Sequence, residues 1–454
     1  MNIRSKAFTL ALLGLLSIGS SSCSDFLYPE PQNSLTAEQV FTDEAGANAA
    51  LIGTFGALTS TNYLGNSYPV FSDMAADNLL WNGSFPSWSE IKNRSIIPSN
   101  ADNTNMYAAI YVAINRANNV IAYTPGIASI SDANKALIVA QARFVRAACY
   151  FDLTRYWGDA ALILTPTTTT GEVLNIARSP KAAVYDQIKQ DLDAAEAALP
   201  DVSVGRGTKW AAKALKARLA LYRQDWASAA SLADEVIASG RFQLLSNFRN
   251  VWTTENSAES IWEIQMETVG QRSFLAFYLL PVGGGRGEAI TLGSTLSAAF
   301  ETGDTRKNAT LSDGTFTLST GTRVPAGNQI KYCQVSGDDN FRYIRYAEVL
   351  LIAAEAKARV GTAASLTAAL GHLNQIRTRA GLPASTAATS ASLLAAIAQE
   401  RRVELALEGH RWFDLIRTGT AQSTLGITDA NKLLFPIPLR EIQNNPNMTQ
   451  NPDY

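Results

Sequence analysis

The sequence predicts a mostly α protein, a superhelix of tetratricopeptide-like helical pairs that carries an irregular, loop-rich region containing minor β structure. Three observations predict it. Helical periodicity dominates the chain. Two consecutive amphipathic segments, 210–222 and 226–239, form a hairpin with a seam of small residues. Two long stretches rich in Gly, Asn, Ser and aromatic residues interrupt the helices. Because a stack of hairpins grows by adding repeats, a chain of 454 residues can remain one domain.

The N-terminus predicts secretion. Arg4 and Lys6 precede an apolar run at 7–18, and small residues then lead to Cys23. The run is too short to span a membrane, so residues 1–22 are predicted to be a signal peptide. The small residues before Cys23 favour cleavage there and acylation of the cysteine, as in bacterial lipoproteins, although Ser20 stands where the usual motif has leucine. Simple cleavage and secretion is the alternative.

Residues 23–454 are expected to form a single domain, with its helical scaffold at about 23–60, 105–247 and 341–435. One helix ends near Trp157-Gly158 and buries Gln141, Phe144, Ala148 and Phe151 on one face. Others are predicted at 179–199, 210–222, 226–239, 345–360, 365–380 and 392–417. Pro200, Gly240, Gly361 and Gly381 supply stop signals.

Loop-rich regions are expected at about 60–105 and 248–340. The second contains short β-like runs at 260–265, 315–318 and 329–334, and its glycine run, Gly283–Gly287, is expected to be its most flexible point. The tail at 436–454 contains several prolines and is expected to be extended.

The segment 400–419 carries three glutamates, Glu400, Glu404 and Glu408, at a spacing of four. Like charges at that spacing repel one another on a bare helix. Apolar residues flank the charged strip on two sides, which is typical of a helix sandwiched between others. We therefore expect some of these charges to be paired inside the protein. A surface helix with solvated ion pairs is the alternative.

Several motifs resemble one known family. Arg143-Phe-Val-Arg-Ala-Ala-Cys-Tyr-Phe-Asp-Leu-Thr-Arg-Tyr-Trp-Gly-Asp159, Tyr343-Ile-Arg-Tyr-Ala-Glu-Val-Leu-Leu-Ile-Ala-Ala-Glu-Ala356 and Leu373-Asn-Gln-Ile-Arg-Thr-Arg-Ala-Gly-Leu382 occur in this order. The segment 400–419 follows, with Trp412-Phe-Asp414 inside it, and then Leu434-Phe-Pro-Ile-Pro438 and Gln450-Asn-Pro-Asp-Tyr454. Together they resemble the SusD/RagB family, the surface nutrient-binding lipoproteins of Bacteroidota, over nearly the whole mature chain.

The resemblance implies a non-catalytic protein that is lipid-anchored through Cys23 on the outer face of the cell outer membrane. There it would act with a SusC-like, TonB-dependent transporter, to which it delivers an oligosaccharide or, in some members, a peptide. The motifs themselves are interpreted as scaffold, because a buried charge without its partner costs several kcal/mol. The residues expected to form paired charges between helices are Arg345, Glu348, Glu355, Glu404, Glu408, Arg411 and Asp414.

The first candidate ligand site is the stretch 77–90. A sugar presents apolar C–H faces and a rim of hydroxyls, so its site needs aromatic faces and polar side chains. Trp81, Phe85 and Trp88 supply the faces, and Asp77, Asn78 and Asn82 supply the polar groups. The alternative is that Phe85 and Trp88 fill a small core within the loop.

The second candidate is the stretch 277–287, where Tyr278 could stack and Arg286 could donate to hydroxyls or a carboxylate. Its glycines would let the backbone approach a ligand closely, and a structural turn is the alternative. Tyr63 and Tyr68 rank third, and Arg286 or Arg94 would suit an acidic sugar.

Other classes of function find less support. A formal net charge of −2, without basic clusters, argues against nucleic acid as a partner. The two histidines, His372 and His410, lack partners at metal-ligand spacing, and no cofactor or metal is expected. A surface glycoside hydrolase, which needs two carboxylates in a cleft, is the main enzymatic alternative. Cys149 is expected to pack in a helix, and its pairing with Cys333 stays open.

Overall fold

The computed structural model describes residues 36–169, 171 and 175–454. The predicted signal peptide and Cys23 lie outside the described residues. The helices of the first half are α3 (Ala37–Val40), α4 (Glu44–Leu58), α5 (Ser67–Ala75), α6 (Pro86–Asn93), α7 (Ala101–Tyr123), α8 (Asp132–Trp157), α9 (Lys181–Ala198), α10 (Lys209–Tyr222) and α11 (Trp226–Ala238). Those of the second half are α12 (Asn250–Thr253), α13 (Leu275–Leu279), α14 (Leu296–Ala299), α15 (Lys307–Thr310), α16 (Tyr346–Val360), α17 (Ala363–Arg379), α18 (Ser390–Glu404), α19 (Arg411–Arg417), α20 (Ala421–Leu425) and α21 (Leu439–Asn444). The strands are β1 (Leu80–Trp81), β2 (Ser260–Ile264), β3 (Ala289–Ile290) and β4 (Phe341–Arg345).

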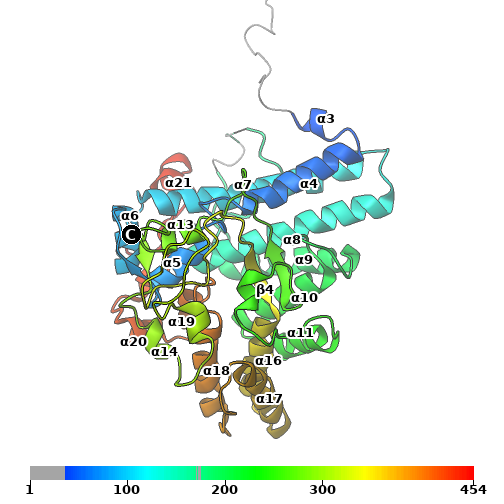
Figure 1. Ribbon diagram of the computed structural model, residues 1–454. Coiled ribbons are helices and arrows are strands. Elements are labelled where there is room, and N and C mark those ends of the chain that lie inside the picture. Colours follow the sequence, from blue (N-terminus) through cyan, green and yellow to red (C-terminus); the bar gives the residue numbers. More distant parts are fainter. Residues whose placement is uncertain (1–35, 170, 172–174) are drawn as a thin grey trace, which may run out of the picture.

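A stack of helices forms the scaffold. Each helix from α7 to α11 packs on the next, and α11 packs directly on α16, which in turn packs on α17 and α18 (Figure 1). The ion pairs Lys357–Asp234, at 2.6 Å, and Arg218–Glu348, at 2.5 Å, hold α16 against the preceding helices. The mostly α prediction is confirmed, and residues 239–345 form an insertion that leaves the stack between α11 and α16 and returns to it.

Local signals explain the boundaries of the α10–α11 hairpin. Thr208 caps α10 by accepting from the N–H of Ala211, and Asp225 caps α11 by accepting from the N–H of Ser228. Ala217 and Ala229 are fully buried, so the two helices meet along the predicted seam of small residues. These are the boundaries that the sequence predicts to within about one residue.

A small two-stranded sheet forms where the insertion returns to the helical stack. Strand β2 pairs antiparallel with β4, which runs directly into α16. The predicted strand at 260–265 is therefore confirmed, and its partner occupies residues just before the predicted helix start. The other two β-like runs, 315–318 and 329–334, form no strand, because each makes only a single bridge, Thr317 to Arg323 and Gln329 to Leu311. Without a longer partner, neither run can build a ladder.

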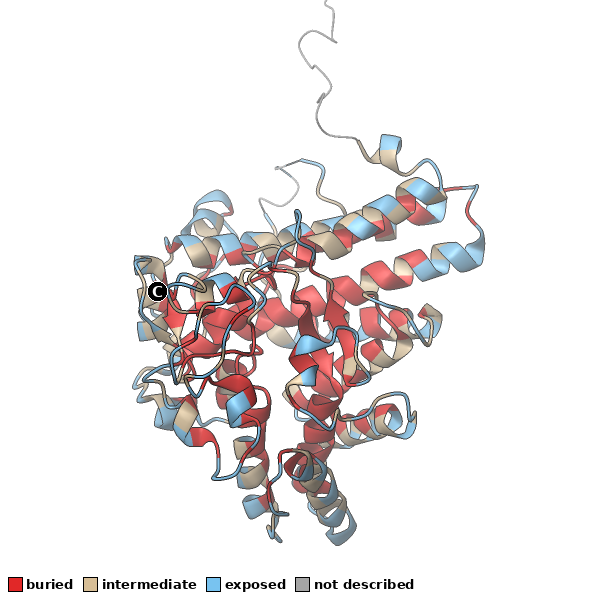
Figure 2. Ribbon diagram, viewed as in Figure 1, coloured by how far each residue is buried: buried red, intermediate tan, exposed pale blue. Residues whose placement is uncertain are grey.

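The region 60–105 contains more helix than its composition suggests. All nine residues of α5 are buried, so its apolar residues show no single face from which a helix could be predicted. Figure 2 shows the buried residues gathered where helices and the insertion meet. The tail predicted to be extended contains one helix, α21, within residues 436–454.

The single helix predicted at 392–417 is wrong. Helix α18 ends at Glu404 and α19 begins at Arg411, because the backbone turns at Leu407, with φ of 67°, and Gly409, with φ of 78°. The Asp73 carboxylate accepts from the N–H groups of Leu407 and Gly409, both at 3.1 Å. A buried carboxylate from α5 thus satisfies backbone groups that a continuous helix would have satisfied itself.

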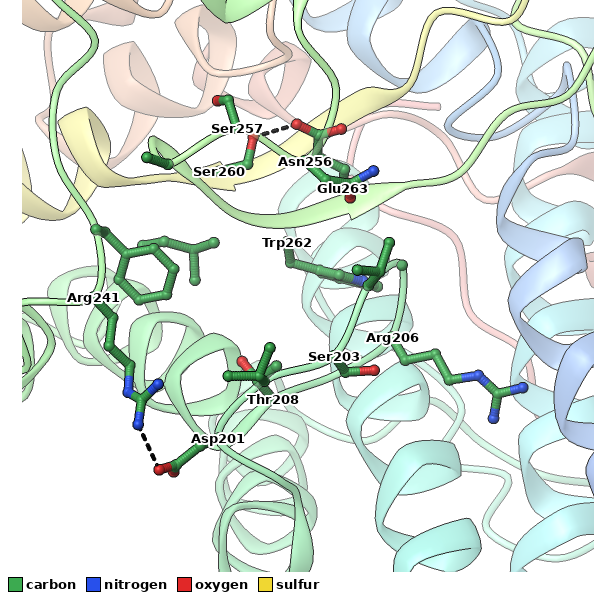
Figure 3. A pocket seen from close by; sticks show the side chains of 16 residues that line it. Asp201, Ser203, Arg206, Thr208, Arg241, Asn256, Ser257, Ser260, Trp262 and Glu263 are labelled. Carbon is green, nitrogen blue, oxygen red and sulfur yellow. Dashed lines mark hydrogen bonds and ion pairs between the residues drawn. The ribbon is translucent and has the colours of Figure 1, made fainter.

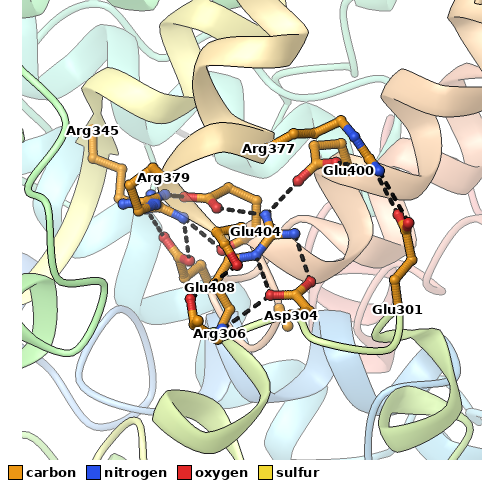
Figure 4. A network of polar contacts seen from close by, with 12 residues as sticks. Glu301, Asp304, Arg306, Arg345, Arg377, Arg379, Glu400, Glu404 and Glu408 are labelled. Atoms are coloured by element: carbon orange, nitrogen blue, oxygen red, sulfur yellow. Dashed lines mark hydrogen bonds and ion pairs between the residues drawn. The ribbon is translucent and has the colours of Figure 1, made fainter. Parts of the chain in front are cut away.

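The predicted pairing of charges between helices is confirmed (Figure 4). Arg345 contacts Glu404 at 2.5 Å, Glu408 at 2.8 Å and Glu259 at 2.8 Å, and these four side chains are buried. Although burial opposes ionisation, Arg345 and Lys331 hold the pKa of Glu408 below its usual value. The remaining predicted charges are also paired, although not all of them between helices. Glu348 pairs with Arg218, Glu355 with Arg417, and Asp414 with Arg401 and, within its own helix, with Arg417. Arg411 pairs with Asp77, which lies in the turn after α5.

The two cysteines within the described residues are free. Cys149 is fully buried in α8, where it packs as a small apolar residue, as expected. Cys333 is half-buried in the insertion, and the Arg249 guanidinium donates to its sulfur at 3.0 Å. The fold is therefore held by packing and ion pairs without a Cys149–Cys333 disulfide.

Candidate ligand-binding face

Strands β1 and β3 join the two predicted ligand loops. Trp81 pairs with Ala289 and Leu80 with Ile290 in antiparallel register. The pairing continues into the first loop, because the Asn82 N–H donates to the carbonyl of Glu288 at 3.0 Å. The structure thus places 77–90 and 277–290 side by side, although about two hundred residues separate them in sequence.

Four aromatic side chains of these two loops reach the surface. We call Trp81, Phe85, Phe277 and Tyr278 the aromatic face. Phe277 is 45% exposed and Trp81 36%, while Phe85 and Tyr278 are partly buried. Ring centroids lie 5.0 Å apart for Phe277–Tyr278 and 6.2 Å apart for Phe85–Tyr278. Phe85, Phe277 and Tyr278 brace one another, so these three rings can present apolar surface without losing side-chain freedom on binding.

Arg286 and Glu288 connect the two loops through polar contacts. The Arg286 guanidinium lies 4.5 Å from the centroid of the Phe85 ring, and its Nε donates to Glu288 at 2.6 Å. Glu288 is buried and also accepts from the N–H of Ser84 at 2.9 Å. A Cβ at Gly83 would collide with the Glu288 carboxylate, so glycine is needed there. One buried carboxylate therefore positions both the first loop and the arginine.

The glycine run is a structural turn. A Cβ at Gly285 would lie 2.6 Å from the carbonyl oxygen of Phe277, and the Arg286 N–H donates to that same carbonyl at 2.6 Å. The glycines let the backbone of this turn come close to α13, in place of the ligand that the sequence suggests. The turn consequently fixes Phe277, Tyr278 and Arg286 relative to one another.

Three predicted site residues have partners within the protein: Trp88 and Asn78 are buried and Asp77 is partly buried. Trp88 is 3% exposed and meets Phe71 and Tyr278, in each case at 5.3 Å between centroids, so it supports the aromatic face from below. Asn78 is fully buried and donates to Asp73 at 2.7 Å. Asp77 pairs with Arg411 at 2.7 Å and with Arg402 at 2.9 Å. Although burial opposes it, these arginines hold the pKa of the Asp77 carboxyl below its usual value.

The lower-ranked candidates also have structural roles. Tyr63 is fully buried and donates to Asp152 at 2.6 Å, and Tyr68 packs in the same core. Arg94 donates to the carbonyl of Ala75 at 3.0 Å, at the C-terminus of α5. Sequence reasoning missed Phe277, which begins the second stretch, and Glu288, which follows the glycine run. Only its position beside the glycines could have marked Glu288.

A separate pocket of about 330 Å³ lies between the α9–α10 connection and β2 (Figure 3). Trp262 lines it but is 2% exposed and packs on Phe144 and Tyr343. Asp201 pairs with Arg241 at 2.7 Å on one side of this pocket. The pocket therefore presents little aromatic surface compared with the aromatic face.

Among the described residues, no group of three or more His, Cys, Asp or Glu side chains is placed to hold a metal ion. His410 is buried, and its pKa is lowered by burial to about 4. Burial lowers the pKa of His372, and so does the Lys357 ammonium, which lies 3.3 Å from its Nε2 atom. In the part of the chain that the structure covers, no helix has the length and apolar character to cross a membrane.

Comparison with known proteins agrees with this architecture. A family model described as the SusD family matches residues 301–432, and one described as starch-binding associating with outer membrane matches residues 25–221. SusD-like protein P2 of Formosa agariphila is 28% identical, over 95% of this chain and 97% of that protein.

Solved structures share the fold. A laminarin binding SusD-like protein has a TM-score of 0.80 at 26% identity, covering 91% of this chain and 100% of that one. Surface glycan-binding protein A from Bacteroides thetaiotaomicron, in complex with laminarihexaose, has a TM-score of 0.76 at 24% identity, covering 90% and 100%. The motifs, the two family matches and the shared fold agree: the chain belongs to the SusD family.

Proposed function

We propose that this protein binds oligosaccharide at the aromatic face and delivers it to a SusC-like, TonB-dependent transporter of the outer membrane. The observation that carries the binding proposal is the junction of two distant loops, which brings the rings of Phe85, Phe277 and Tyr278 together and leaves Trp81 exposed on the strand that joins the loops. The laminarin binding SusD-like protein, which shares the fold at 26% identity, supports a glycan ligand.

The chemistry of the face suits a carbohydrate. Exposed rings accept the C–H faces of sugar rings, and polar groups beside them bind hydroxyls. Asn82 is exposed and its side chain donates to the carbonyl of Gly287 at 3.3 Å, which leaves its amide oxygen to accept from a ligand hydroxyl. Arg286 is 44% exposed along its side chain, but Glu288 offsets its charge. This favours neutral sugars over strongly acidic ones.

The proposed role is non-catalytic. Acidic groups around the face already have partners: Glu288 binds Arg286 and Ser84, Asp77 binds two arginines, and Asp102 accepts from Ser87. A glycosidase needs one carboxyl poised to protonate the leaving group and a second one to act as nucleophile or base. Product formation from any bound glycan would contradict the proposal, and chromatography of the mixture after binding measures it.

Attachment to the outer membrane is proposed through lipid on Cys23. The family description of outer-membrane association and the motif around Cys23 support it. Mass spectrometry of the protein from membranes tests it, since an acylated N-terminal cysteine is expected and Cys23→Ser should release soluble protein. The transporter role rests on the family, and co-purification of a TonB-dependent barrel with the tagged protein from its native membranes tests that part.

Calorimetry tests the ligand. The chain from Ser24 onward is titrated with neutral hexasaccharides, including laminarihexaose, and with a peptide pool. We expect saturable glycan binding that Trp81→Ala weakens at least tenfold, about 1.4 kcal/mol. Ile52→Ala is the matched control, because Ile52 is a large exposed apolar residue on α4. Binding of peptide alone would replace the glycan proposal with the peptide alternative, and equal loss in both variants would argue against the aromatic face.

A further inference from the structure

A groove between α7 and α21 lies outside the loops that form the aromatic face. Its volume is about 990 Å³, three times that of the pocket beside β2. Residues of α7, of the segment after α8 and of α21 line it. This volume falls at the upper end of the range in which proteins hold small ligands.

Aromatic rings of α7 face this groove. Tyr107 and Tyr111 are four residues apart, so they lie on the same side of the helix, with ring centroids 4.9 Å apart. The Tyr111 hydroxyl donates to the carbonyl of Ala161 at 3.0 Å, and Tyr107 meets Trp157 at 5.1 Å. Tyr111 is only partly buried and Val112 is 48% exposed. Both offer apolar surface in fixed positions.

Hydrogen bonds hold the walls in place. Asn118 donates to the carbonyls of Ile163, at 2.8 Å, and Thr165, at 3.0 Å. The Thr167 N–H donates to Asn115 Oδ1 at 2.8 Å, and the N–H of Leu439 at the start of α21 donates to the carbonyl of Pro98 at 2.8 Å. The groove is therefore preformed, which lowers the entropy cost of binding.

The rim is polar and nearly balanced in charge. Gln443 and Asn444 are exposed amides on α21, and Asn115 presents a third amide from α7. Arg440, Arg116 and the partly buried Glu441 are the charged groups, and the Arg116 guanidinium donates to the carbonyl of Gly53 at 2.7 Å. Aromatic surface with amides, one carboxylate and two separated cations matches a polyhydroxylated neutral ligand better than a strongly charged one.

We propose that the α7–α21 groove is a second carbohydrate-binding site, which takes a segment of a neutral oligosaccharide with a sugar ring against Tyr111. This proposal rests on the proposed function, since it assigns the same ligand class to a second place. None of the residues that line the groove belongs to the aromatic face. Two sites on one chain would let it hold a long glycan at two points, which raises the effective concentration of the second contact.

Counting bound ligands tests the second site. Titration of the chain from Ser24 onward with the neutral hexasaccharides should give two sites per chain for a glycan that binds. Ala108→Trp fills the groove from an exposed position on α7, and Ala136→Trp on α8 is its matched control. We expect one site of unchanged affinity in Ala108→Trp, one in Trp81→Ala, none in the double variant and two in Ala136→Trp. Tyr111→Ala should weaken binding at the groove at least tenfold.

The outcomes separate the two proposals. A single site that Trp81→Ala abolishes and Ala108→Trp leaves intact would overturn the second site and leave the proposed function standing. Two sites that persist in Ala108→Trp would also overturn it, because the second ligand would then bind elsewhere. Capture of peptides at the groove in place of every glycan would overturn the carbohydrate assignment. If no glycan binds the unmodified chain, both proposals fail.

Discussion

The buried charge network and the aromatic face use similar side chains in different surroundings. Arg345 is 1% exposed, contacts three carboxylates and lies 5.8 Å from the centroid of the Trp252 ring. Arg286 contacts one carboxylate and lies 4.5 Å from the Phe85 ring, but its side chain is 44% exposed. Both arginines join segments that are distant in sequence.

The difference in burial decides what each group can do. In the network, every donor of Arg345 that reaches a carboxylate is shielded from water, so removal of one partner leaves an uncompensated buried charge. On the aromatic face, water reaches the Arg286 guanidinium, so its ion pair with Glu288 is partly screened and the guanidinium remains able to meet a ligand. Substitutions in the buried charge network should therefore change stability, whereas substitutions on the aromatic face should change binding.

The largest effect is expected at Arg345. Arg345→Met removes the cation that Glu259, Glu404 and Glu408 share, and we expect a loss of about 3–5 kcal/mol in the free energy of unfolding. Arg223→Met is the control, since Arg223 pairs with Asp186 in solvent and should cost under about 1 kcal/mol. Urea denaturation measures both, and equal losses would remove the distinction between buried and exposed pairs.

A pH effect of intermediate size is expected from His410. Burial lowers its pKa to about 4, while an unfolded histidine titrates near pH 6.5. Between these values the unfolded chain binds a proton that the folded protein does not. Stability should thus be complete above pH 6.5 and decline as pH falls through about 4, by about 1.4 kcal/mol per unit at most. His410→Gln should flatten this decline in denaturation curves recorded from pH 7 to 4.

Asp73 provides a control, because its titration should change stability with pH in the opposite direction to that of His410. Burial raises its pKa to about 6, so the folded protein binds the proton more tightly than an unfolded carboxyl near pH 3.9. That contribution is complete at low pH and is lost as pH rises through about 6. Asp73→Asn should therefore steepen the loss of stability on acidification. A smaller loss of stability on acidification in Asp73→Asn than in the unmodified protein would contradict this expectation.

At the aromatic face, Gly83→Ala should affect binding more than stability. The added Cβ would meet the Glu288 carboxylate, so the first loop must shift relative to Arg286 and Tyr278, which it contacts through Ser84 and Phe85. We expect at least tenfold weaker glycan binding by calorimetry with a change of about 1 kcal/mol or less in unfolding. Gly53→Ala on α4, where a Cβ meets nothing within 4 Å, should leave binding unchanged. Unaltered binding in Gly83→Ala would show that the loop position is unimportant.

The smallest change in stability is expected for Arg286→Ala. Its ion pair with Glu288 is partly solvated, so we expect a cost of about 1 kcal/mol or less, reduced further by salt. Glycan binding should weaken, because Arg286 is proposed to donate to ligand hydroxyls, and its guanidinium lies over the Phe85 ring. A stability loss as large as that of Arg345→Met would mean that Glu288, which is buried, depends on this partner more than its exposure indicates.

The sequence by itself determined the helical stack. Helices α9, α10, α11, α16 and α17 are predicted within about two residues, because most of their boundaries carry a cap, a proline or a glycine within their own segment. The pairing of charges was also predicted, since a helix with apolar residues on two sides must bury the strip between them. All of these signals are local.

Only the tertiary structure decided the break at 405–410 and the composition of the aromatic face. The break depends on Asp73 and Lys331, which reach residues 406–409 from α5 and from the insertion. The face depends on β1 meeting β3, and on Trp88 and Asn78 being buried against Phe71, Tyr278 and Asp73 while Trp81 and Phe277 stay exposed. No local pattern encodes these outcomes, because each requires groups from distant segments to meet in the folded protein.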